Sequence, residues 1–100
     1  MKMPKKIRIG STIFDVKIIP NLADGSTRLD GHIVYGPSEI RIESSFGRQR
    51  KQIILWHEII HALLDQSAAE LGDNTERVCE IVSHGIVSVL RDNEYLRGEK

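Results

Sequence analysis

The residues in this sequence that are best suited to chemistry are His57, Glu58 and His61, which form the motif H-E-x-x-H. The motif lies in an apolar stretch, with Ile53–Trp56 before it and Ala62–Leu64 after it, which favours a helix. Residues four apart on a helix share a face, so the two imidazoles can bind one zinc ion. Glu58 lies beside them and can take a proton from metal-bound water as a general base. The motif therefore predicts a catalytic zinc site.

A catalytic zinc site needs a third protein ligand, and the sequence offers several. Metzincin-type sites have a histidine six residues after the second histidine of the motif. Ser67 occupies that position here, so this class is excluded. Glu76 and Glu80 lie four residues apart on the next predicted helix, and His84 continues the same face. Periodicity alone leaves all three as candidate ligands.

The elements that must position these residues divide the chain into a strand half and a helix half. Stretches rich in β-branched residues predict four short strands, and two apolar patterns of helical period follow them. A polar segment with a glycine, Asn21–Asp30, predicts a loop. The predicted strands are Lys5–Ile9, Thr12–Ile19, Gly31–Tyr35 and Glu39–Glu43, and the predicted helices are residues 49–66 and Thr75–Leu90.

This order of elements predicts an α+β fold. A small antiparallel sheet of about four strands precedes the active-site helix and a second packed helix, and both helices cover one face of the sheet. The apolar face of the second helix is expected to point toward the core; it consists of Val78, Ile81, Val82, Ile86 and Val89.

Length and composition narrow the class of protein. One hundred residues suit a single domain, residues 1–100, and Cys79 is the only cysteine, which excludes an intrachain disulfide and a cysteine-rich zinc site. The formal net charge is zero, which argues against nucleic-acid binding through bulk charge. There is no apolar stretch long enough to span a membrane and no secretory signal. We therefore expect a cytoplasmic protein that binds neither nucleic acid nor membrane.

Residues from about 31 to 96 resemble the minimal HExxH metallopeptidases of phages and prophages, which are related to the ImmA/IrrE-type domain. The resemblance implies a zincin-like fold that holds Zn²⁺, with an acidic third ligand on the second helix. In that family the acid precedes small or apolar residues, which Glu76 matches approximately, with Glu80 as the alternative. A phage-encoded member would act in the host cytoplasm. The matching pieces are Gly31–Ile33, Ile40–Ile42, Arg48–Arg50, Leu55–Ala62, Glu76–Val82 and Leu90–Asn93.

The function expected from the motif and the resemblance is zinc-dependent hydrolysis of peptide bonds, with a protein or peptide as substrate. Glu58 is the expected catalytic base, and His57, His61 and Glu76 (alternatively Glu80) are the expected metal ligands. The strand Ile40–Glu43 is expected to pair with an extended substrate. A chain of this size can need a protein partner to complete its cleft. The alternative is a non-catalytic zincin-fold binding or assembly protein of a phage-like element.

Overall fold

The computed structural model of the chain describes residues 3–67 and 71–98. Six strands and four helical segments follow one another, and the strands come first, as predicted. The strands are β1 (Lys6–Ile9), β2 (Thr12–Ile19), β3 (Ala23–Asp24), β4 (Thr27–Arg28), β5 (Gly31–Val34) and β6 (Glu39–Glu43). The helices are α1 (Arg48–Gln66) and α2 (Thr75–Asp92), with short 3₁₀ turns η1 (Gly72–Asn74) and η2 (Glu94–Arg97). The expected α+β class is confirmed.

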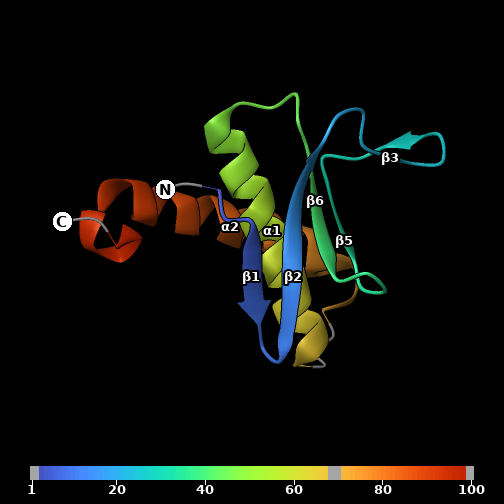
Figure 1. Cartoon of the computed structure of the whole chain (residues 1–100). Helices are drawn as coiled ribbons and strands as arrows, with labels where there is room; N and C mark the ends of the chain where they lie inside the picture. Colours follow the sequence, from blue (N-terminus) through green and yellow to red (C-terminus); the bar gives the residue numbers. More distant parts are fainter. Residues whose placement is uncertain (1–2, 68–70, 99–100) are drawn as a thin grey trace.

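The main sheet has four strands in the order β1-β2-β6-β5 (Figure 1). The pairs β1–β2 and β5–β6 are antiparallel, whereas β2 and β6 are parallel, with Val16 opposite Ile40. The expectation of a wholly antiparallel sheet is therefore wrong. After β2 the chain crosses to β5 and then turns back into β6, which fills the gap between them. This crossover makes β6 run in the direction of β2.

This topology also corrects the expected substrate strand. β6 pairs on both sides, and its residues Ile40 and Ile42 are fully buried. A strand hydrogen-bonded to two neighbours has no free edge for a peptide, so the prediction that Ile40–Glu43 pairs with substrate is wrong. β5 is the end strand of the sheet and borders α1.

The segment predicted as a loop, Asn21–Asp30, contains the small hairpin of β3 and β4. Figure 1 shows it projecting from one end of the main sheet. Leu22 anchors its base: its side chain is buried, and its backbone N–H donates to Glu43 Oε1 at 2.6 Å. The buried Glu43 carboxylate also accepts a hydrogen bond from the backbone N–H of Ser45, so its charge is well satisfied.

The hydrophobic core lies between the sheet and α1. The helix α1 contacts both the strands and α2, whereas α2 contacts no strand in the described part of the chain. The expectation that both helices cover the sheet is therefore wrong: α1 packs on the sheet, and α2 packs on α1. The core cluster consists of Ile9, Phe14, Ile40, Ile42, Ile54, Leu55, Ile59 and Ala62.

The buried face of α2 differs from the predicted one. Cys79, Ser83 and Val87 are buried, whereas the larger side chains Ile81, Val82 and Val89 are exposed. Each of these three buried residues follows a predicted core position by one residue, so the side of α2 that packs against α1 is rotated from the predicted apolar face. Val78 and Ile86 are half-buried at the border. No helix in the described part of the chain is both long and apolar enough to cross a membrane.

Candidate metal centre

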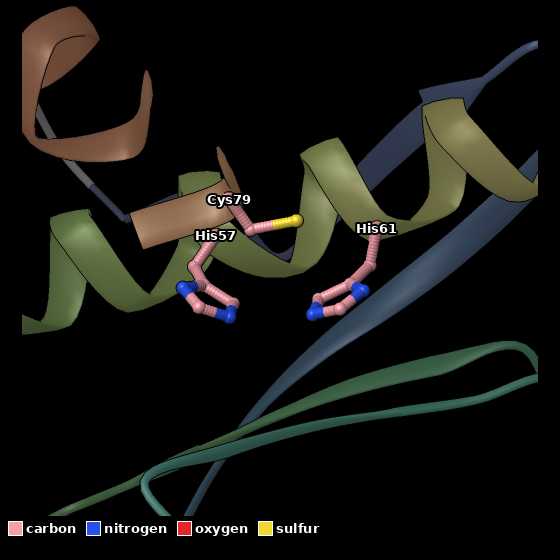
Figure 2. Close-up of side chains that lie close together, drawn as sticks. All are labelled: His57, His61 and Cys79. Atoms are coloured by element: carbon pink, nitrogen blue, oxygen red, sulfur yellow. The ribbon is translucent and has the colours of Figure 1, made fainter. Parts of the chain in front are cut away.

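The two histidines of the motif lie side by side on α1 (Figure 2). Their ring centroids are 5.0 Å apart, as expected for residues separated by one helical turn. Only 13% of the His57 side chain and 19% of the His61 side chain are exposed. Packing of α1 against β5, β6 and α2 therefore holds both rings in a defined place.

Glu76, in the first turn of α2, joins the two imidazoles. Its Oε2 lies 3.1 Å from Nε2 of His57, and its Oε1 lies 2.5 Å from Nε2 of His61. The same nitrogen of each ring thus points at one carboxylate. The structure brings together the three residues that the sequence and the resemblance favoured as metal ligands.

Glu80, the alternative ligand, meets the other nitrogen of His57. Its Oε2 lies 3.1 Å from Nδ1, while its Oε1 lies 2.8 Å from Nε2 of His84 and 3.3 Å from Nη1 of Arg50. Burial opposes ionisation of Glu80, but hydrogen bonds from His84 and Arg50 hold its pKa below the ordinary value. A carboxylate on Nδ1 fixes the tautomer and orientation of an imidazole whose Nε2 is directed elsewhere.

His84, the third candidate ligand on α2, is a hydrogen-bonding partner of Glu80. His84 contacts Glu80 rather than the ring nitrogens of the motif, and its side chain is half exposed. Arg50 also contacts Asp30, with 3.4 Å between its Nη2 and Oδ2 of Asp30. Through its contacts with both acids, Arg50 links α2 to the chain just before β5. These contacts support the wall of the site next to His57.

Glu58 follows His57 on α1 and lines the same cavity as the two histidines, with only 8% of its surface exposed. Burial raises its pKa from 4.5 to about 7. The charge of His61 and a backbone hydrogen bond with Ile33 lower it in part, and the charge of Glu76 raises it further. A carboxyl with a pKa near neutrality can both accept and release a proton, as general acid–base catalysis requires.

A glycine on the neighbouring strand makes room for Glu58. A Cβ at Gly31 would lie 2.4 Å from Cγ2 of Ile54 and 3.3 Å from Oε2 of Glu58. Only a residue without a side chain lets β5 approach α1 so closely. No sequence pattern indicated that Gly31 must lack a side chain, because Ile54 and Glu58 are distant in sequence and only the fold brings them next to it.

A cavity of about 610 Å³ opens in front of these residues. Its walls come from three parts of the chain: β4 with the start of β5, α1, and the first turns of α2. His57, Glu58, His61, Glu76 and Glu80 all line it. Its size suits a small ligand or a short stretch of peptide. Tyr35, by contrast, is turned toward the far end of α1, where its hydroxyl donates to Asp65.

Cys79 is the residue of the site that the sequence did not single out. Its side chain is fully buried, and its sulfur and one ring nitrogen each of His57 and His61 all lie within 4.8 Å of one another. Figure 2 shows the side chain reaching toward the space between the two rings. Burial, followed by the charges of Glu76, Glu58 and Asp65, raises the pKa of the thiol to about 11. A spacing of three residues from Glu76 was the only available signal.

The donor atoms of the site fit a zinc ion. Two imidazole nitrogens directed at one carboxylate reproduce the type and number of protein ligands in catalytic zinc sites. Glu80 supplies the hydrogen bond that a ligating imidazole usually makes through its other nitrogen. Comparison with known proteins adds no family to this geometry: the chain matches no family model, no curated protein and no solved structure.

Proposed function

We propose that this chain is a zinc-dependent peptidase of the minimal phage and prophage HExxH type, related to the ImmA/IrrE-type domain. One observation carries the proposal: Nε2 of His57 and Nε2 of His61 are both directed at the carboxylate of Glu76, beside a buried Glu58. Burial also raises the pKa of Glu58 to about 7, and an acid perturbed in this way inside a cavity is a candidate for a functional group.

In this proposal His57, His61 and Glu76 hold the zinc ion. Bound zinc would supply Lewis acidity toward a water molecule and the scissile carbonyl. Glu58 takes the proton from the attacking water and passes it to the leaving amine, a task that suits its pKa of about 7. Glu80 acts through His57, because its contact with Nδ1 keeps Nε2 directed at the metal position.

The substrate peptide, in this proposal, lies along β5. β5 is the end strand of the sheet, and Gly31, His32 and Ile33 line the same cavity as the histidines. A peptide added to that edge forms backbone hydrogen bonds with the strand, so its scissile bond passes in front of His57 and His61. A protein partner would extend this short edge, since β5 has four residues.

The experiment that tests catalysis is the substitution Glu58→Gln. The zinc-loaded protein is incubated with a mixed peptide library, and cleavage products are identified by mass spectrometry. We expect wild type to cleave peptides and Glu58→Gln to bind zinc as wild type does but to lose cleavage, because an amide cannot accept the proton. Glu94→Gln, an exposed acid outside the cavity, is the matched control and retains activity. Equal cleavage by Glu58→Gln and wild type would remove Glu58 from the mechanism.

A non-catalytic binding or assembly protein is the second candidate function. The exposed side chains of Ile81, Val82 and Val89 on α2 favour it, since apolar surface of this kind commonly marks a contact with another protein. Bound zinc without any cleavage that depends on Glu58 would support this candidate over the peptidase.

A further inference from the structure

We propose that Cys79 is a thiolate ligand of the metal held by His57 and His61. The inference rests on the proposed metal site, and it adds a sulfur donor to the imidazole and carboxylate donors of that site. It assigns Cys79 a role in binding, beyond filling space between two helices.

The first support is the position of the sulfur. Cys79 lies on α2, three residues after Glu76, so both side chains leave the helix on the same side. The sulfur and the ring nitrogens of His57 and His61 lie within 4.8 Å of one another. Ligand atoms around a tetrahedral zinc ion are about 3.5 Å apart, given Zn–S near 2.3 Å and Zn–N near 2.0 Å. A movement of about 1 Å therefore brings all three donors to one metal ion.

The second support is the contrast in burial between the two donors of α2. Cys79 is 0% exposed and is held between α1 and α2, whereas 74% of the Glu76 side chain is exposed. A donor fixed by packing loses little freedom when it binds a metal, and an exposed glutamate loses more. Histidines from α1 and a cysteine from α2 thus make a set of three donors fixed by packing. Glu76 would then be a fourth, exposed donor, and its exchange with water would leave the open position that hydrolysis needs.

The chemistry of the step is a simple exchange. The metal ion replaces the thiol proton of Cys79, and the proton leaves to solvent, so charge and atoms balance without an oxidant or reductant. A thiolate is a soft donor that favours Zn²⁺ over Mg²⁺, Ca²⁺ or Mn²⁺. The presence of Cys79 should therefore make the site selective against the hard divalent ions.

The decisive measurement is X-ray absorption at the zinc edge on the wild-type chain loaded with one equivalent of Zn²⁺. We expect one sulfur neighbour at about 2.3 Å and nitrogen or oxygen neighbours at about 2.0 Å. A shell of nitrogen and oxygen alone would overturn the role of Cys79 and leave the site of His57, His61 and Glu76 standing. No bound zinc at all would overturn both the inference and the proposed function.

Variants then tie the sulfur signal to this residue. In the Co²⁺-loaded protein, Cys79→Ala should remove the sulfur-to-cobalt charge-transfer absorption and weaken metal binding by more than about 100-fold, the upper range for groups that only orient a ligand. Glu94→Gln, at an exposed position outside the cavity, is the control and should keep that absorption. An unchanged spectrum in Cys79→Ala would refute the assignment. Because the wild-type measurement needs no variant, poor folding of Cys79→Ala would not prevent the test.

Discussion

Replacing Glu58 by Gln should make the metal-free protein more stable at alkaline pH. Glu58 is buried, and burial raises its pKa from 4.5 to about 7. A carboxyl whose pKa is higher in the folded chain holds its proton more tightly there than in the unfolded chain. Its stabilising contribution is therefore complete below pH 4.5 and is lost as the pH rises through about 7. An amide does not titrate, so Glu58→Gln avoids this loss.

The size of the effect follows from the two pKa values. A difference of one pH unit corresponds to about 1.4 kcal/mol, so the rise from 4.5 to about 7 corresponds to about 3 kcal/mol of unfolding free energy at full ionisation. Most of this loss falls between pH 5 and pH 8. For a domain of this length the equivalent change in Tm is roughly 10 °C or more.

The assay is urea unfolding of the chelator-treated protein, followed by circular dichroism at pH 5 and pH 8. Wild type should lose stability relative to Glu58→Gln between these two values, because only wild type must ionise a buried carboxyl. Glu94→Gln makes the same change of charge at an exposed position and should follow wild type. A stability difference between Glu58→Gln and wild type that is the same at both pH values would refute the reasoning.

Three further outcomes are expected at and around the site. The chain should bind about one zinc ion, and elemental analysis should find none in His61→Ala, whereas His84→Ala should keep it because His84 contacts only a carboxylate. Competition with a chromophoric chelator should show a larger loss of zinc affinity for Glu76→Ala than for Glu80→Ala. The loss expected for Glu80→Ala is about 10–100-fold, the range for a group that orients a ligand. The reverse order of the two losses would make Glu80 the ligand. Gly31→Ala should lower the free energy of unfolding by about 1–3 kcal/mol in urea titration, because its Cβ would overlap the neighbouring side chain, and an unchanged midpoint would contradict that packing.

The parts of the fold that depend on local pattern could be predicted from the sequence. The strands Thr12–Ile19 and Glu39–Glu43 have the predicted bounds, and α1 begins within one residue of its predicted start. Alternation and helical period are properties of a few neighbouring residues, so they are visible without the fold. The placement of two histidines on one face of α1 follows from the same local geometry.

The features that the sequence did not reveal all depend on contacts between distant segments. The parallel pairing of β2 with β6 joins residues such as Val16 and Ile40, and no local pattern distinguishes it from an antiparallel pair. The orientation of α2 was missed because its apolar arc is wide. Periodicity favoured Val82 for the side that faces α1, whereas the fold buries its neighbour Ser83, a choice that depends on contacts between the two helices.

The choice between Glu76 and Glu80 depends on the same orientation. Both acids lie on one side of α2, and both touch His57, so distance alone does not separate a ligand from a supporting group. The nitrogen that each acid meets does separate them. Glu76 contacts Nε2 of His57 and also Nε2 of His61, so both of these nitrogens face one carboxylate. Glu80 contacts Nδ1 of His57, on the opposite side of the ring. A metal ion between the two histidines would use the nitrogens that face each other. The contacts therefore favour our proposal that Glu76 is a ligand and that Glu80 holds the imidazole of His57 in place.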